Sequence, residues 1–436
     1  MVTMSSSPGF SGLSPVRTVL SNGAVVLTKR TGTVPAVTIN LGMRAGSVCD
    51  PGDAPGGMYL LSRVIDRGTL ETAASVPRSA DDIAEALDSR GISIGLSVTR
   101  HLFSLVCTCL AEDFDAVMAL VGDIVRAPAV PEDELATRKG EVVTAIRQDH
   151  DNPGVRAVEA LMALLYPPPH PYGIPAKGKA DVIERLTRER LMALHAARFA
   201  PSELSVVVVG DVESDRAADA VARVFGDWSV PQPVAVASSP VAPYGSRRRV
   251  VIPMMNKAQA DVACGFTTIT RNDPSYYACW LMNHAFGQYS MSGRLGDSIR
   301  EKQGMAYYVY SSFDANVMPG PLLVRAGVSP ENVDRAIASI DEELTRLVRD
   351  GLTQTELDDS RRFLIHAMPR SLETNSSIAN FLQNAALYGL GLDYDVRLPG
   401  LLEAVTLDEA NAVARQFLDP EKATVVIAGP YSEERE

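Results

Sequence analysis

The chain has 436 residues, of which 46% are hydrophobic and 22% charged, and its formal net charge at pH 7 is −12. This composition is typical of a globular protein, and the length predicts about two to four domains. The negative charge argues against non-specific binding to nucleic acid or to an anionic membrane surface. No apolar run reaches the roughly 18–20 residues of a membrane span, and the first residues lack the basic and apolar regions of a secretory signal.

The five cysteines form an odd and sparse set, which is more typical of a reducing compartment than of a disulfide framework. Cys107 and Cys109 lie two residues apart in a run that predicts a strand, so both side chains should point to one face. We interpret them as small core residues rather than as metal ligands. Cysteine usage and the absence of a secretory signal together predict a cytoplasmic protein.

The chain contains an internal duplication. Residues 182–212 align with residues 401–431 without a gap. Four pairs of identical residues keep their spacing: Glu184 and Glu403, Thr187 and Thr406, Pro201 and Pro420, and Gly210 and Gly429. Each copy predicts a threonine N-cap, a helix, a proline-containing turn and a buried β-branched strand that ends in glycine.

Earlier segments of the two halves also correspond. The predicted strand 36–42 matches 260–266, and the predicted helices 112–125 and 131–148 match 330–348 and 353–368. Ser79 is predicted to cap the helix that ends near Arg90, with Gly91 as its C-terminal cap.

Residues 229–246 are rich in Pro, Ala, Ser and Val and lack periodicity, which predicts a linker. We therefore predict an α+β protein of two homologous halves, residues 13–228 and 247–432. Each half should hold a mainly antiparallel sheet flanked by helices, and the pair should form a hinged clam around a cavity.

Two motifs resemble a known family. Residues 56–69 read Gly-Gly-Met-Tyr-Leu-Leu-Ser-Arg-Val-Ile-Asp-Arg-Gly-Thr, and residues 292–307 read Ser-Gly-Arg-Leu-Gly-Asp-Ser-Ile-Arg-Glu-Lys-Gln-Gly-Met-Ala-Tyr. The first resembles Gly-Leu-Ala-His-x-x-Glu-His-x-x-x-x-Gly-Thr of the pitrilysin and mitochondrial processing peptidase family, the inverzincins. The second is similar to that family's Ser-Arg-Leu…Leu-Arg-Glu-Lys-x-Gly-Leu-Ala-Tyr signature. The resemblance runs from about residue 13 to 430 and includes the duplication.

In that family, two histidines and a distal glutamate bind zinc, and the glutamate between the histidines is the general base. The resemblance places the two histidine positions on Tyr59 and Arg63, the base on Ser62 and the distal ligand on Ala145, with a further acidic position near Arg138. Alanine has no donor atom, serine is not a base at neutral pH, and an arginine repels a divalent cation. Arg63 could instead place its guanidinium in the empty site.

No histidine pair replaces the lost ligands. The six histidines show no His-x-x-x-His spacing, and we interpret them as surface or packing residues: His101, His150, His170, His195, His284 and His366. We therefore predict that this chain holds no metal and contributes no catalytic residue on the metal side.

The second motif keeps the residues that bind substrate. In family members, an arginine and a tyrosine of this signature hold the substrate backbone near the scissile bond, and the resemblance places them on Arg300 and Tyr307. A guanidinium and a phenol can both donate hydrogen bonds to a peptide carbonyl. The alternatives are a surface ion pair for Arg300 and a core aromatic role for Tyr307. Tyr308 and Tyr310 are candidates if the alignment shifts, whereas Arg294 is predicted to be structural.

The resemblance therefore implies a non-catalytic, substrate-binding subunit of a heterodimeric zinc metallopeptidase. Its partner would be a homologous subunit with an intact His-x-x-Glu-His motif, which supplies the zinc, and the substrate would be a short unstructured peptide. This chain should be inactive alone. Two other functions remain open: an inactive scaffold like the core subunits of a respiratory complex, and a peptide-binding or leader-recognition module.

Overall fold

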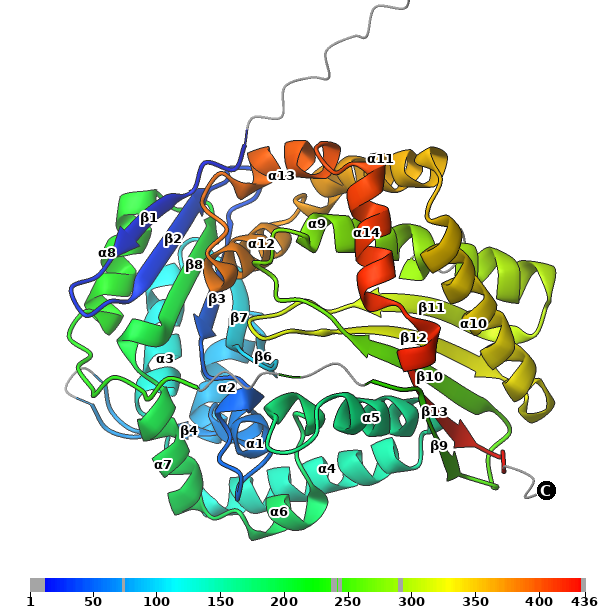
Figure 1. Cartoon of the computed structure of the whole chain (residues 1–436). Helices are drawn as coiled ribbons and strands as arrows, with labels where there is room; N and C mark the ends of the chain where they lie inside the picture. Colours follow the sequence, from blue (N-terminus) through cyan, green and yellow to red (C-terminus); the bar gives the residue numbers. More distant parts are fainter. Residues whose placement is uncertain (1–11, 73–74, 237–240, 242–244, 289–292, 433–436) are drawn as a thin grey trace, which may run out of the picture.

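The computed structural model describes residues 12–72, 75–236, 241, 245–288 and 293–432, which form two large sheets, one two-stranded sheet and the helices around them (Figure 1). Part of the predicted linker, at 237–240 and 242–244, lies outside the described residues, and so does Ser292, the first residue of the second motif. The linker residues that are described contain no helix or strand. Among the described residues, no helix is both long and apolar enough to cross a lipid bilayer.

The first sheet has six strands in the order β1-β2-β8-β3-β7-β6. Only β2 and β8 pair in parallel, and every other pair is antiparallel. The strands are β1 (Val16–Val19), β2 (Val25–Arg30), β8 (Leu204–Gly210), β3 (Ala36–Met43), β7 (Phe103–Leu110) and β6 (Ile94–Val98). A separate two-stranded sheet consists of β4 (Gly68–Thr69) and β5 (Arg78–Ser79).

The second sheet repeats this topology. Its five strands follow the order β11-β12-β10-β13-β9, and only β13 and β9 pair in parallel. The strands are β11 (Ala306–Phe313), β12 (Pro321–Val328), β10 (Ala260–Thr267), β13 (Thr424–Gly429) and β9 (Arg248–Pro253). When the second sheet is read from its β9 edge, its strands β9, β13, β10, β12 and β11 correspond in this order to β2, β8, β3, β7 and β6 of the first sheet. The predicted α+β class with two similar halves is therefore confirmed, and each sheet is mixed.

Helices flank both sheets (Figure 1). Those of the first half are α1 (Gly57–Val64), α2 (Ala80–Asp88), α3 (Phe114–Arg126), α4 (Glu132–His150), α5 (Pro153–Leu165), α6 (Ala180–Arg185), α7 (Arg188–Arg198) and α8 (Ser214–Phe225). Those of the second half are α9 (Tyr276–Asn283), α10 (Val333–Asp350), α11 (Gln354–Ser371), α12 (Asn375–Tyr388), α13 (Tyr394–Glu403) and α14 (Leu407–Phe417). Two π-helical segments, His284–Gln288 and Gly296–Lys302, also belong to the second half.

The predicted N-terminal caps are present, whereas helix α2 ends at Asp88 with Ser89 as its C-terminal cap, so the cap predicted at Gly91 is displaced by two residues. The Ser79 hydroxyl accepts a hydrogen bond from the Asp82 amide, and the Asp82 carboxylate bonds back to the Ser79 amide, which forms a capping box. Thr187 and Thr406 cap α7 and α14, as the duplication predicts. Cys107 and Cys109 are both buried, and burial raises the pKa of their thiols to about 12 and about 11. Their interpretation as core residues is therefore confirmed.

The duplicated glycines close the two central strands in the same way. Gly210 and Gly429 have φ angles of +151° and +145°, which favour glycine. A Cβ atom on Gly210 would lie 2.2 Å from the carbonyl oxygen of Ala36, and one on Gly429 would lie 2.5 Å from the Cα atom of Ala260. Ala36 and Ala260 begin the matching strands β3 and β10. The repeated glycine therefore allows the same close approach between two backbone segments in each half.

The two halves exchange a helix. Helix α5 of the first half packs on β10 and β13, and α12 of the second half packs on β3 and β8. Gly265 of β10 makes room for Leu161 and Leu165, because a Cβ atom there would lie 3.0 and 3.1 Å from their side chains. In the reverse direction, Asn40 of β3 donates to the side-chain oxygen of Asn380 at 2.7 Å. Each sheet is therefore covered by a helix of the other half, and the predicted domain limits and hinged clam stay predictions.

A buried polar cluster joins the halves beside these helices. The His101 Nε2 atom lies 2.6 Å from the Tyr172 hydroxyl, which also accepts a hydrogen bond from the Met318 amide at 3.3 Å. The Tyr166 hydroxyl donates to the carbonyl oxygen of Pro319 at 3.1 Å. Burial, assisted by the charge of Arg100, lowers the pKa of His101 to about 4. His101 is therefore neutral in the folded protein at neutral pH.

This depressed pKa predicts an acid-sensitive contribution to stability. In the unfolded chain His101 should titrate near 6.5, so between pH 6.5 and 4 the unfolded state binds a proton that the folded state excludes. The free energy of unfolding should fall in this window by up to about 3 kcal/mol on account of His101. His101→Gln, which keeps a partner for Tyr172, should lose less stability between pH 7.5 and 5 in urea unfolding. Equal losses in the two proteins would contradict this assignment.

Candidate functional site

Helix α1 carries the first motif, and a buried aspartate fixes where it begins. The Asp50 carboxylate accepts hydrogen bonds from the Gly56 and Met58 amides, both at 2.8 Å. Burial raises the pKa of Asp50 to about 7, although these hydrogen bonds act in the opposite direction. Gly56 has a φ of +90°, and a Cβ atom there would lie 2.5 Å from the carbonyl oxygen of Lys177. Gly56, on which the motif was aligned, is therefore the N-terminal cap of α1.

The three motif positions on α1 have different environments. Tyr59 is half-buried, Ser62 is buried and Arg63 is exposed. The Ser62 hydroxyl donates to the carbonyl oxygen of Tyr59 at 2.7 Å, one helical turn back. Ser62 is therefore bonded to its own helix, and Arg63 extends from the protein surface rather than filling a buried site.

Helix α4 packs against α1 and carries the two remaining positions. Ala145 is half-buried, whereas Arg138 lies 2.5 Å from Glu141 and 3.4 Å from Glu134. Burial raises the pKa of Asp66, on the turn after α1, while the charges of Arg67, Arg138 and Arg63 oppose that shift. The paired helices thus bring three guanidinium groups near one carboxylate.

These residues do not fit a zinc ion. An alanine, a serine bonded to its own helix and two arginines occupy four of the five aligned positions, and they offer no ligand set that zinc prefers. Within the described ranges, no group of three or more His, Cys, Asp or Glu residues is placed to hold a metal ion. We therefore derive no chemical step through a metal in this chain, and its metal content stays a prediction.

The histidines lie apart from one another or in packing positions. His101, His170, His195 and His284 are buried, and His150 and His366 are exposed. His195, for example, places its Nε2 atom 2.8 Å from the carbonyl oxygen of Val125. This distribution agrees with their interpretation as packing and surface residues.

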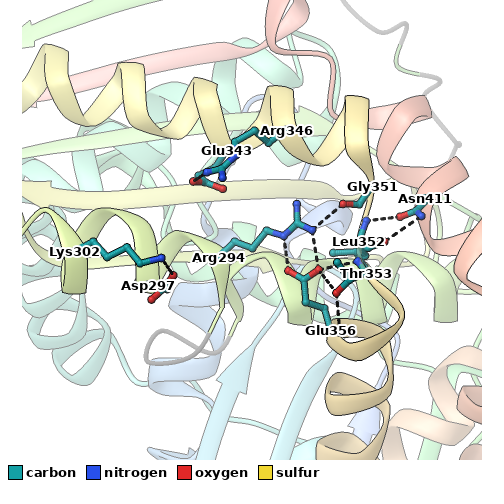
Figure 2. Close-up of polar contacts among 10 residues, drawn as sticks. All are labelled: Arg294, Asp297, Lys302, Glu343, Arg346, Gly351, Leu352, Thr353, Glu356 and Asn411. Carbon is teal, nitrogen blue, oxygen red and sulfur yellow. Dashed lines mark hydrogen bonds and ion pairs between the residues drawn. The ribbon is translucent and has the colours of Figure 1, made fainter.

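The second motif begins with an ion pair that connects three segments (Figure 2). The Arg294 guanidinium donates to both carboxylate oxygens of Glu356, at 2.5 and 2.7 Å, and to the carbonyl oxygen of Gly351 at 2.7 Å. Glu356 also belongs to the capping box of α11 with Thr353. This geometry agrees with the predicted structural role of Arg294.

Arg300 and Tyr307 lie on adjacent segments of the second half. Arg300 belongs to the π-helical segment Gly296–Lys302, which packs against β11, where Tyr307 lies. The Arg300 side chain is 37% exposed, and its Nε atom lies 3.8 Å from the carboxylate of Glu301. Tyr307 is 82% exposed because the β11–β12 register shifts between Ala306 and Tyr308. A core role for Tyr307 is therefore excluded, whereas a surface ion pair describes part of the environment of Arg300.

Tyr308 and Tyr310 are engaged elsewhere. The Tyr308 hydroxyl donates to the carboxylate of Asp261, and Arg325 donates to the Tyr310 hydroxyl at 2.9 Å. Arg325 also donates to the carbonyl oxygen of Gly154, at the start of the exchanged helix α5. Burial raises the pKa of Tyr308. Sequence reasoning missed this network, whose members are distant in the chain and share no motif. Its presence favours Tyr307 as the exposed tyrosine of the signature.

Comparisons with known proteins cover most of the chain. Residues 25–167 match the family model described as insulinase (peptidase family M16), and residues 185–364 match the model described as peptidase M16 inactive domain. An uncharacterised zinc protease of Mycobacterium tuberculosis is 28% identical over 428 residues, which cover 97% of this chain and 95% of that protein. An uncharacterised zinc protease of Bacillus subtilis is 25% identical over 413 residues, covering 94% and 98%.

Solved structures have the same fold. The peptidase M16 inactive domain from Pseudomonas fluorescens superimposes with a TM-score of 0.87 at 25% identity, covering 97% of this chain and 99% of that one. A protease from Helicobacter pylori gives a TM-score of 0.86 at 17% identity, covering 95% and 99%. At 17% identity, the similarity to the Helicobacter pylori protease shows a shared fold only.

Proposed function

Because this chain belongs to the M16 peptidase family, we propose that it is the substrate-binding, non-catalytic subunit of a heterodimeric zinc metallopeptidase. The partner is a homologous subunit with an intact His-x-x-Glu-His motif, which supplies the zinc and the general base. The substrate is a short unstructured peptide that is held between the two subunits. This chain alone has no peptidase activity.

The observation that carries the proposal is the contrast between the two motifs. The positions that would bind zinc hold Tyr59, Arg63 and Ala145, which cannot replace two histidines and a glutamate. The positions that would bind substrate hold an arginine and a tyrosine, and both side chains reach the surface. An inactive scaffold would have no need for an exposed pair of hydrogen-bond donors at those positions.

The proposed chemistry of this chain is hydrogen bonding to the substrate backbone. The Arg300 guanidinium has several N–H donors, and the Tyr307 hydroxyl adds one more. Both groups can donate to a peptide carbonyl and bind more strongly as negative charge develops on its oxygen. Since the protein carries a net charge of −12, these donors lie on an otherwise acidic molecule.

The test is reconstitution. This chain should be co-purified with a homologous subunit from the same cell that has the complete motif, and cleavage of a quenched fluorescent peptide library should be measured. We expect cleavage by the mixed pair, loss of cleavage with a chelator, and no stoichiometric zinc in this chain alone. Peptidase activity of the isolated chain, with zinc bound to it, would overturn the proposal. A stable pair that cleaves nothing would favour the scaffold or the peptide-binding module.

A further inference from the structure

The segment that carries Arg300 is attached to the rest of the second half by Arg294. Figure 2 shows Arg294 extending from the start of this segment toward the turn between α10 and α11. Its fork bonds both oxygens of Glu356, and its Nη2 atom also bonds the carbonyl oxygen of Gly351. The two charged side chains are only 18% and 29% exposed. Bidentate pairs that are shielded from water in this way fix direction as well as distance.

Glu356 is itself held in place. Its carboxylate accepts hydrogen bonds from the amide and the hydroxyl of Thr353, both at 2.8 Å. Burial would raise the pKa of Glu356, but the hydrogen bonds from Arg294 and Thr353 outweigh it and lower that pKa. Glu356 is therefore ionised at neutral pH and serves both the cap of α11 and the fork of Arg294.

The turn between α10 and α11, which Arg294 contacts, is also held by a side chain of α14. Asn411 of α14 accepts a hydrogen bond from the Leu352 amide at 2.6 Å, and its side-chain amide donates to the Leu352 carbonyl oxygen at 3.4 Å. Gly351 has a φ of +75°, and a Cβ atom there would lie 2.6 Å from the Asn411 side chain. The anchor of Arg294 thus joins α10, α11 and α14 (Figure 2).

The segment that follows Arg294 is held by core packing and by an ion pair. Leu295 and Ile299 are fully buried in the core of the second half, and Lys302 pairs with Asp297 at 2.6 Å. These two charged residues are five apart, which is the hydrogen-bond spacing of a π-helix. Such short π-helical segments are frequent at functional sites. Arg300 follows Ile299 directly, so the direction in which its side chain leaves the surface is set by this segment.

We propose that Arg294 and Glu356 are positioning residues for Arg300: their partly buried ion pair holds the π-helical segment at the angle at which Arg300 meets the substrate carbonyl. This inference rests on the proposed function for the role of Arg300. The attachment of the segment can be measured without it. Neither Arg294 nor Glu356 contacts substrate in this scheme.

Two variants test the pair. Arg294→Lys keeps the charge but loses the planar fork. Glu356→Gln weakens the bond to Arg294, while glutamine can still complete a capping box with Thr353. The matched controls are Arg349→Lys, an exposed arginine at the end of α10, and Glu409→Gln, the capping-box glutamate of α14. All four proteins keep their helix caps, so an effect seen in the two variants and not in the controls belongs to the contact between Arg294 and Glu356 rather than to a changed charge or cap. Urea unfolding of each protein shows whether the overall fold is kept.

The first readout uses the isolated chain. Hydrogen exchange of the amides of residues 295–302 should become about tenfold faster in Arg294→Lys and Glu356→Gln than in the controls. The second readout uses the mixed pair. Its kcat should fall about 10- to 100-fold with KM nearly unchanged. In an Arg300→Ala background, Arg294→Lys should cause no further loss, since a positioning residue acts only through the group that it positions.

Each outcome decides the inference. Unchanged kcat and unchanged exchange in both variants would overturn it, and so would an equal loss of kcat with and without Arg300. If the wild-type pair cleaves no peptide, the proposed function fails. In that case faster exchange still supports the attachment of the segment by Arg294, and unchanged exchange overturns it.

Discussion

Replacing Arg300 by alanine should lower the kcat of the mixed pair by about 10²- to 10³-fold, the typical loss for one preorganised oxyanion donor. The side chain is 37% exposed, and its ion pair with Glu301 is long, at 3.8 Å, so its removal should cost little stability. Melting of the isolated chain and the affinity of the two subunits should therefore stay nearly unchanged. The measurement is steady-state kinetics of the reconstituted pair on one defined peptide.

Two companion variants separate the contact with substrate from the local ion pair. Glu301→Gln removes the charge beside Arg300 and should leave kcat near the wild-type value. Tyr307→Phe removes one hydroxyl from a side chain that is 82% exposed, and it should reduce kcat less than Arg300→Ala. Wild-type cleavage by the Arg300→Ala pair would eliminate the assigned role of this arginine.

Replacing Gly210 by alanine should destabilise the protein by about 3 kcal/mol or more, because backbone atoms must move to admit the methyl group. The new Cβ atom would lie 2.2 Å from the carbonyl oxygen of Ala36, and φ is +151°. Both obstacles belong to the backbone at the centre of the first sheet, so no side chain can rotate to relieve them. Urea unfolding should show a lower midpoint with an unchanged slope.

Gly140→Ala is the matched control for this substitution. Gly140 lies inside α4, and a Cβ atom there would meet nothing within 4 Å. Alanine should stabilise the helix by about 0.5–1 kcal/mol, since glycine is the poorer helix former. If Gly210→Ala unfolds at the same urea concentration as the wild type, the close approach at Ala36 does not exist in solution.

The local elements and their duplication could be predicted from the order of amino acids. The threonine caps of α7 and α14, the N-cap at Ser79 and the glycine ends of β8 and β13 were all predicted within a residue or two. These signals are readable because caps, strand patterns and backbone glycines act over a few neighbouring residues. The alignment on Gly56 likewise placed the degenerate positions on one helix, α1, and on α4, which packs against it.

How these elements combine depends on packing between distant parts of the chain. An apolar helix face predicts burial but not the surface that buries it, so nothing local showed that α5 and α12 cover each other's sheets. The exposure of Tyr307 depends on a register shift against β12, and the Asp261, Tyr308 and Arg325 contacts join residues far apart in the chain. Strand order, helix exchange and side-chain direction arise from long-range packing, whose partners a short sequence window does not contain.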